Sequence, residues 1–480
     1  MPRDTFDRDL GLAYLARLRE LGVETRSIVA MRGGEVVFEH ATHPFPLDYV
    51  HPLYSVTKSF TSVAVGMLVD EGRVDVGRPW ISWFPEYEAA VADERFLGVT
   101  VRDLLTMTLG QDGEPYVRSD DDWALGVVGK ELSHEPGTVF CYNSMCSHLL
   151  SMLVQRVSGQ RLADFLSKRL FEPLGIRRWW WEEDRRGHST GGFGLHLSTP
   201  DLARFGQCLL DGGTWEGRRV IPAAWVAEAT RLQVRTRPFL PADATEDRNG
   251  YGYQFWMCAG GGFRCSGLFG QLCYVRPEDA LVVAASSSTT GSKVLLDPLY
   301  EVLGGGHPVC GVSGSSLDVL PVVDGAAHAR ASEERLEGRH RCLDNPGGFD
   351  VFELHVDDEP TVGPQVHLTF ERGGDRFRID AGSGDWLRAP AGQRPVGELF
   401  PFATHGAERD APPSWDVPAT FASYGWTSPT TLVISVRELD ATRRTFVRMS
   451  VDGRYALCEL WAEGMLGGME PMRYTMAAEV

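Results

Sequence analysis

The chain has 480 residues, of which 43% are hydrophobic and 23% are charged, and its formal net charge is −18. This length exceeds a single ordinary core, so two globular domains are expected. The negative charge argues against nucleic-acid binding and against adsorption to anionic membranes, and no apolar run reaches the ~18 residues that span a bilayer.

The first 21 residues alternate charged and apolar side chains, so we expect no secretory signal. The nine cysteines are an odd number without the spacing of a disulfide framework. Together these features predict a cytoplasmic protein with buried thiols.

The first part of the chain alternates between a predicted hairpin and a long run of helices. Apolar residues at helical spacing predict a helix over 7–21, and strands 26–31 and 35–39 flank the turn at Gly33. Start and stop signals then predict a helix that begins at Ser55 and helices over 101–109, 144–157, 161–170, 201–210 and 222–231.

Strands return before residue 305. Alternation and turn residues predict strands over 251–258, 263–266, 271–275 and 281–285, followed by a helix over 294–303. Helices are therefore inserted between an N-terminal hairpin and later antiparallel strands. This order predicts an α/β domain over 1–305 whose sheet is built from both ends of the segment.

A second domain is predicted after a Gly/Ser-rich linker over 306–316. Beyond the linker, period-2 alternation predicts strands over 365–371, 376–381, 431–438, 445–451 and 456–462. The segment 317–480 is therefore expected to be an all-β antiparallel sandwich or barrel.

Ser55 and Lys58 stand one helical turn apart, ahead of an apolar run that ends before Gly72. Residues three apart lie on one helix face, where a desolvated amine can take the proton of the hydroxyl. The alternative is a capping serine with a surface lysine. Lysine is rare in this chain, and no other lysine has a serine three positions before it; the others are Lys130, Lys168 and Lys293.

Two further motifs are weaker on their own. Tyr142 and Ser144 stand just before a predicted helix, where a phenol and a hydroxyl can face a cleft, although a tyrosine that packs a helix start is more common. Cys265, Ser266 and Gly267 end a predicted strand, and a glycine there lets a substrate approach the strand edge closely. The alternative is an inner strand with a glycine bulge.

In this order the three motifs resemble the penicillin-recognising serine enzymes, and more narrowly the cytosolic β-lactamase-related hydrolases and esterases. The resemblance spans roughly 20–305 and includes the segments 102–108, 140–150, 171–176, 191–194, 250–256 and 267–271. It implies a β-lactamase/transpeptidase-like fold, an antiparallel sheet with a helical cluster. The C-terminal segment resembles no family beyond its β pattern.

The resemblance also implies roles for the motif residues. Ser55 is the nucleophile, Lys58 its base, and Tyr142 relays a proton to the leaving group. Ser144 stands where many relatives have asparagine. The N–H groups of Ser55 and Leu268 form the oxyanion hole.

Cys265 departs from the pattern of the enzymes that act on β-lactams or peptidoglycan. Those relatives carry lysine or histidine at this position, where a cation holds a substrate carboxylate. A neutral thiol cannot do so, and strand alternation turns the adjacent Arg264 to the opposite face. We therefore expect little action on substrates with a free carboxylate.

The resulting prediction is a serine hydrolase that cleaves a small ester or amide through an acyl-enzyme. The alternatives are an acyltransferase that uses the same intermediate, or a non-catalytic ligand-binding protein on this fold. We expect a small-molecule substrate and no nucleic-acid or membrane partner. No cofactor or metal site is predicted, because histidines such as His188 and His196 are scattered, and Cys141 and Cys146 lack further ligands at metal-binding spacing.

Overall fold

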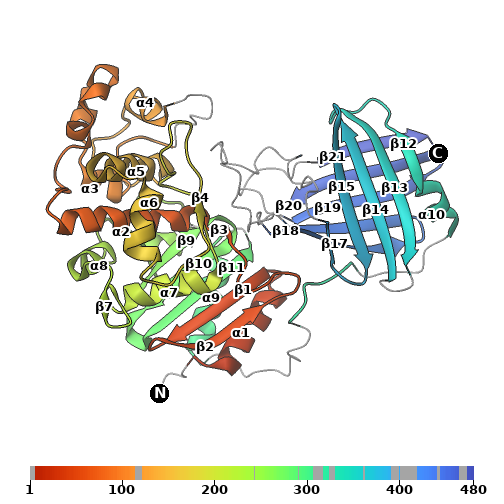
Figure 1. Cartoon of the computed structure of the whole chain (residues 1–480), viewed down its shortest axis with the longest axis horizontal. Coiled ribbons are helices and arrows are strands. Elements are labelled where there is room, and N and C mark those ends of the chain that lie inside the picture. Colours follow the sequence, from red (N-terminus) through yellow and green to blue (C-terminus); the bar gives the residue numbers. More distant parts are fainter. Residues whose placement is uncertain are drawn as a thin grey trace. The chain divides into compact units, whose positions relative to one another are not determined.

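Figure 1 shows the computed structural model of the chain, in which the described residues are 6–113, 122–242, 244–289, 291–305, 317–323, 330–359, 363–390, 399, 419–439, 444–463 and 473–479. They form two compact units, one with 6–41 and 46–305, the other with 42–45 and the residues after 317. The predicted linker 306–316 lies outside the described residues, so the domain boundaries stay a prediction. No described helix is both long and apolar enough to cross a membrane.

The first unit is organised around a six-stranded antiparallel sheet in the order β2-β1-β11-β10-β9-β8. Its strands are β1 (Glu24–Arg32), β2 (Glu35–Ala41), β8 (Trp256–Met257), β9 (Phe263–Gly267), β10 (Gln271–Arg276) and β11 (Leu281–Ser288). The pairing of β1 with β11 joins the N-terminal hairpin to the later strands. The prediction of a sheet built from both ends of the segment is confirmed.

The sheet is covered on both faces, because successive strand residues point to opposite sides. Ile28 and Ala30 share a core with α1 (Arg8–Glu20) and α9 (Lys293–Leu303). Val29 and Met31 belong to a second core with the helical cluster.

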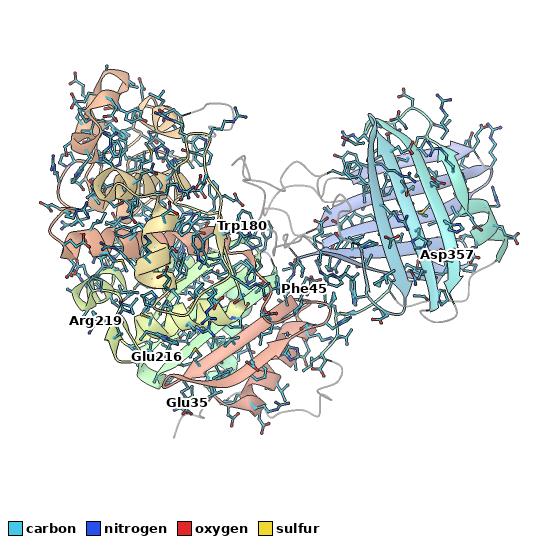
Figure 2. The ribbon with its side chains drawn as sticks, in the orientation of Figure 1. Glu35, Phe45, Trp180, Glu216, Arg219 and Asp357 are labelled. Atoms are coloured by element: carbon cyan, nitrogen blue, oxygen red, sulfur yellow. The ribbon has the colours of Figure 1, made fainter. Side chains whose placement is uncertain are left out.

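The helical cluster packs on that second face and is visible around α2 and α5 in Figure 1. It comprises α2 (Thr57–Asp70), α3 (Val101–Leu105), α4 (Trp123–Val128), α5 (Ser144–Ser158), α6 (Leu162–Leu166), α7 (Thr199–Leu210) and α8 (Ala223–Ala229). A three-stranded sheet of β3 (His51–Pro52), β5 (Leu195–Leu197) and β4 (Trp180–Trp181) borders α2. In Figure 2, Glu216 and Arg219 mark the exposed hairpin of β6 (Thr214–Trp215) and β7 (Arg218–Arg219).

Three predicted elements differ in the structure from their predicted form. The helix expected over 101–109 ends at Leu105, because the Thr106 hydroxyl bonds the Arg102 carbonyl and Met107 adopts a φ of 59°. The helix over 161–170 becomes α6 plus a π-helical turn, Ser167–Phe171. The strand over 251–258 is reduced to β8, because Gln254 adopts a φ of 68°.

The second unit is an all-β sheet of ten strands with a short helix, α10 (Arg330–Leu336). Its strands are β12 (Gly338–Arg341), β13 (Phe349–Glu359), β14 (Gly363–Arg372), β15 (Asp375–Ser383), β16 (Leu387–Arg388), β17 (Thr420–Ser428), β18 (Thr431–Glu438), β19 (Arg444–Asp452), β20 (Tyr455–Glu463) and β21 (Arg473–Glu479). The Leu343 amide, just after β12, donates to the Ala477 carbonyl in β21 at 2.8 Å. This bond joins the first and last strands, as in a barrel. The predicted C-terminal β domain is confirmed, and β12, β13, β16, β17 and β21 are additional to the predicted strands.

Candidate active site

Ser55 lies in a short 3-10 turn, Tyr54–Val56, that leads directly into α2. The turn begins with Tyr54 at a φ of 49°, a left-handed conformation that is uncommon outside glycine. The preceding segment is held in place because the Leu53 amide donates to the Leu195 carbonyl at 2.9 Å. Ser55 is therefore presented in the turn just before α2, whereas the sequence predicted a helix that begins at Ser55.

Lys58 is buried, with 1% of its surface exposed, and its ammonium nitrogen meets three oxygens. The Nζ lies 2.9 Å from Ser55 Oγ, 3.0 Å from Ser144 Oγ and 2.7 Å from the Gly192 carbonyl oxygen. The carbonyl can only accept, whereas each hydroxyl can donate or accept. Lys58 Nζ therefore donates to all three oxygens, one of which is the hydroxyl of Ser55.

Tyr142 stands beside the same nitrogen, with the centre of its ring 4.7 Å from Lys58 Nζ. The ring stacks on Trp256 at 5.5 Å and meets the edge of Tyr251 at 6.4 Å. Burial, with the nearby Tyr142 phenol adding to it, raises the pKa of Tyr251 well above its usual value. This aromatic wall fixes the orientation of Tyr142.

The end of β9 lies against the backbone of Ser55. A β-carbon on Gly267 would stand 2.3 Å from the Leu53 carbonyl oxygen and 3.3 Å from the Ser55 nitrogen. Only a glycine allows this approach. The end of β9 therefore lies next to Ser55, and the side chain of Ser266 turns to a hydrogen bond with Ser292.

Cys265 is expected to face the substrate, but the structure buries it, with 1% of its surface exposed. It lies opposite Cys273 in the β9–β10 register, and their thiols interact. Arg264 is also buried and lies 3.4 Å from Glu246, whose carboxylate accepts from the Tyr300 hydroxyl on the α9 side of the sheet. The predicted turn of Arg264 to the opposite face is confirmed.

The sequence motifs did not indicate the contacts of Gly191 and Gly192. The Gly191 carbonyl accepts from the Thr61 hydroxyl at 2.7 Å, and the Gly192 carbonyl accepts from Lys58. A β-carbon on Gly191 would stand 1.9 Å from the Ser147 carbonyl oxygen. The two adjacent glycines are the sequence feature that could have indicated these contacts. Residues without a side chain let this segment pass close to both α2 and α5.

The Ser55 hydroxyl stands just before a helix and is bonded to a buried lysine, with a tyrosine beside it. The sheet next to this site is covered by helices on both faces. This combination defines a serine hydrolase of the β-lactamase type. The family model described as Beta-lactamase matches residues 14–303, and the chain belongs to this family.

Relatives in this family carry hydrolase names. The chain is 30% identical over 292 residues to the 6-aminohexanoate-dimer hydrolase of Paenarthrobacter ureafaciens, covering 55% of this chain and 72% of that protein. It is 29% identical over 187 residues to Esterase EstB of Burkholderia gladioli, covering 33% of this chain and 47% of the esterase.

Among solved structures, the octameric penicillin-binding protein homologue from Pyrococcus abyssi matches with a TM-score of 0.51 at 17% identity. The match covers 98% of this chain and 99% of that one, so the likeness of fold extends over both units.

Proposed function

We propose that the protein cleaves a small ester or amide through an acyl-enzyme formed on Ser55. The observation that carries this proposal is the 2.9 Å contact between Lys58 Nζ and Ser55 Oγ, made in a buried position. A nucleophile and a base within hydrogen-bonding reach, with the base oriented by further groups, is the arrangement that nucleophilic catalysis requires.

In the first step Ser55 Oγ attacks the substrate carbonyl carbon, and its proton passes to Lys58 Nζ. The N–H groups of Ser55 and Leu268 donate to the oxyanion that forms. The carbon–oxygen or carbon–nitrogen bond to the leaving group then breaks. Tyr142 delivers the proton that this group needs and is reprotonated from Lys58.

In the second step a water molecule attacks the acyl carbon, and Lys58 takes one of its protons. The bond to Ser55 Oγ breaks, the serine regains a proton, and the acid product leaves. Ser144 and Gly192 remain bonded to the lysine in both steps, so that the amine keeps its position as its protonation changes.

The substrate class rests on what surrounds the site. Cys265 offers no positive charge, and the guanidinium of Arg264 is engaged by carboxylates on the opposite face of the sheet. A relative named for the hydrolysis of a 6-aminohexanoate dimer and another named as an esterase support an ester or amide.

A fluorophosphonate probe tests the nucleophile. The probe is expected to label wild-type protein at Ser55, with labelling lost in Ser55→Ala and retained in Ser82→Ala, which changes an exposed serine. Lys58→Met is expected to slow labelling by roughly 100–10,000-fold, the usual contribution of a general base. Lys168→Met, at an exposed lysine, is the matched control.

Two outcomes would reject the proposal. One is a labelled peptide that does not contain Ser55. The other is a folded Lys58→Met variant that reacts as fast as the wild type.

A further inference from the structure

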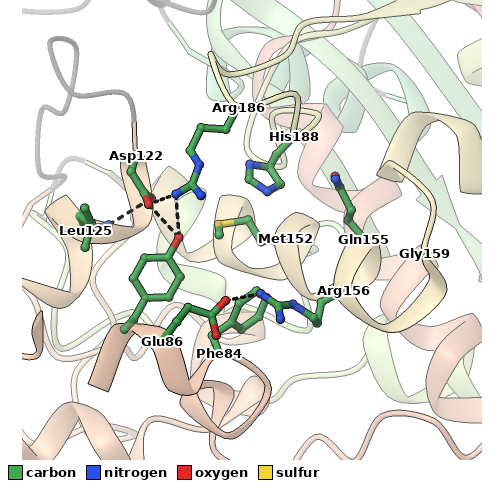
Figure 3. Close-up of a pocket in the computed structure, with 11 residues that line it drawn as sticks. Phe84, Glu86, Asp122, Leu125, Met152, Gln155, Arg156, Gly159, Arg186 and His188 are labelled. Atoms are coloured by element: carbon green, nitrogen blue, oxygen red, sulfur yellow. Dashed lines mark hydrogen bonds and ion pairs between the residues drawn. The ribbon is translucent and has the colours of Figure 1, made fainter. Parts of the chain in front are cut away.

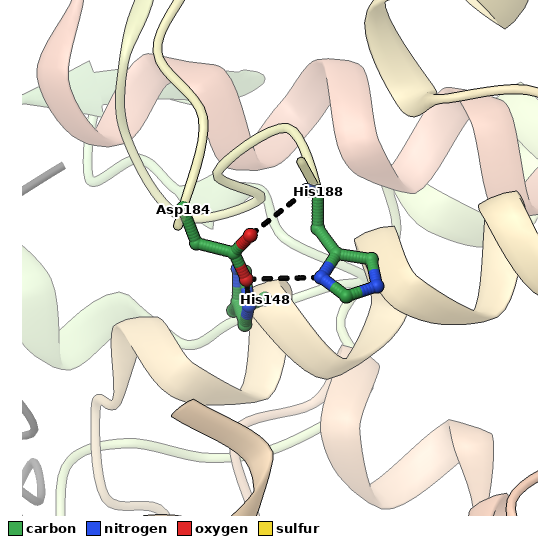
Figure 4. Close-up of side chains that lie close together, drawn as sticks. All are labelled: His148, Asp184 and His188. Atoms are coloured by element: carbon green, nitrogen blue, oxygen red, sulfur yellow. Dashed lines mark hydrogen bonds and ion pairs between the residues drawn. The ribbon is translucent and has the colours of Figure 1, made fainter. Parts of the chain in front are cut away.

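Three side chains outside the candidate active site meet at one point. His148 lies on α5, and Asp184 and His188 lie in the segment between β4 and β5 (Figure 4). The Asp184 Oδ2 atom is 3.2 Å from His148 Nε2 and 3.0 Å from His188 Nδ1. The three ligand atoms all lie within 4.8 Å of one another, the single group of this kind among the described residues.

These two separations are close to those between ligands of a shared metal ion. Zinc binds imidazole nitrogen and carboxylate oxygen at about 2.0–2.2 Å, which places neighbouring ligands of a tetrahedral site about 3.3–3.5 Å apart. Two imidazoles with one carboxylate form a donor set that zinc sites use.

The His148 ring is enclosed by the protein. Its side chain is 2% exposed, its Nε2 lies 3.2 Å from Asp184 Oδ2, and its Nδ1 makes no hydrogen bond with a described residue. A buried nitrogen without a hydrogen bond is unfavourable.

The second carboxylate oxygen of Asp184 fixes the orientation of the side chain. Its Oδ1 accepts from the backbone N–H groups of Arg186 and His188, both at 2.9 Å. The carboxylate is thus oriented before any ion arrives, as supported metal ligands are.

We propose that His148, Asp184 and His188 bind one divalent zinc ion, with a water molecule in the fourth position. An entry path exists, because His188 also lines a cavity of about 580 Å³ (Figure 3). The wall of this cavity carries the ion pairs Arg186–Asp122 and Arg156–Glu86.

The ion would brace the two elements that surround Lys58. His148 stands one helical turn after Ser144 on α5, and His188 stands four residues before Gly192. Ser144 and Gly192 both bond Lys58. The ion would therefore act by holding these two elements in place, with no part in the chemistry at Ser55.

The test is zinc binding by the full chain, purified without a polyhistidine tag and stripped with a chelator. Zinc chloride is titrated against a competing chelating indicator, and cobalt(II) serves as a spectroscopic probe of ligand geometry. Wild type is expected to take up one equivalent of zinc, to show the visible absorption of tetrahedral cobalt, and to melt at a higher temperature with zinc present.

Variants distinguish specific zinc binding by these three residues from adventitious binding elsewhere. His188→Ala changes a ring that is 17% exposed, and Asp184→Asn preserves shape, so both are expected to fold. Each should weaken zinc binding by at least ~10–100-fold and abolish the zinc-dependent rise in melting temperature. The control is His134→Ala, at a partly exposed histidine 2.9 Å from Asp112, which should bind as the wild type does.

The proposal fails if stripped wild type takes up no zinc. It also fails if zinc binds but His188→Ala and Asp184→Asn, shown to be folded by circular dichroism, retain the wild-type affinity. In that case the three side chains form only a buried hydrogen-bonded cluster.

Discussion

Gly267 approaches Leu53 so closely that a β-carbon on the glycine would stand 2.3 Å from the leucine carbonyl oxygen. The contact joins the end of β9 to the turn that carries Ser55, two segments that are more than 200 residues apart in the sequence. The end of β9 is thereby held beside the Ser55 nitrogen, as the proposed oxyanion site requires.

Gly267→Ala is expected to push these segments apart and to impair catalysis without unfolding the protein. Removal of one oxyanion donor costs roughly 100–1000-fold in kcat, and displacement should give a loss near ~100-fold. Hydrolysis of p-nitrophenyl acetate is the measurement. Gly98→Ala, where no atom lies within 4 Å of the added carbon, is the control. An alanine variant with full activity would contradict the proposed oxyanion site.

Selectivity against carboxylates can be measured with matched substrates. A cation beside the acyl carbon would add a charge-assisted hydrogen bond of ~1.5–3 kcal/mol, or about one to two powers of ten in rate. Because Cys265 lacks that charge, p-nitrophenyl hemisuccinate should be cleaved no faster than p-nitrophenyl butyrate, and benzylpenicillin slowly or not at all. A tenfold preference for the hemisuccinate would show that another cation reaches the substrate.

The free energy of unfolding is expected to decrease as the pH is lowered, because of His51, which is fully buried in β3. Burial lowers its pKa from 6.5 to about 3. Between these values the unfolded chain binds a proton that the folded chain does not, so the free energy of unfolding rises with pH and is fully regained above 6.5. The slope from this group is about 1.4 kcal/mol per pH unit.

Urea unfolding at pH 4.5, 5.5 and 7.5 measures this slope. His51→Gln should flatten it by about 1.4 kcal/mol per unit relative to the wild type. His134→Gln, at a partly exposed histidine, should leave it unchanged. If the free energy of unfolding depends on pH equally in wild type and in His51→Gln, His51 is protonated in the folded protein.

Gln254 is expected to be a main polar support of the helical cluster. Its side-chain amide donates to the carbonyls of Leu104 and Leu105 at 3.1 and 2.9 Å, and its Oε1 accepts from the Ser147 hydroxyl at 2.5 Å. Gln254→Met keeps the size of the side chain but leaves the Leu104 and Leu105 carbonyls and the Ser147 hydroxyl without this partner.

The expected loss in the free energy of unfolding for Gln254→Met is about 2–4 kcal/mol, from two or more unsatisfied groups. Chemical denaturation measures it, and Gln160→Met, at an exposed position, is the control. Equal unfolding midpoints for the two variants would show that water replaces the lost hydrogen bonds.

The sequence alone was sufficient for features that depend on local pattern. Strand alternation and helix start and stop signals predicted the α/β unit, the later β unit and the pairing of the first hairpin with the last strands. The rare lysine one turn after Ser55 indicated the contact that the structure shows at 2.9 Å, because neighbours on a helix face meet whatever surrounds them.

Tertiary structure alone decided what lies around that pair. The third oxygen at Lys58 comes from Gly192, a backbone carbonyl 134 positions away that no side-chain motif can reveal. The burial of Cys265 against Cys273 depends on strand register. His188, which stands alone in the sequence, meets His148 only because the segment between β4 and β5 folds back onto α5. Such contacts depend on the packing of distant elements, whereas sequence patterns report on one element at a time.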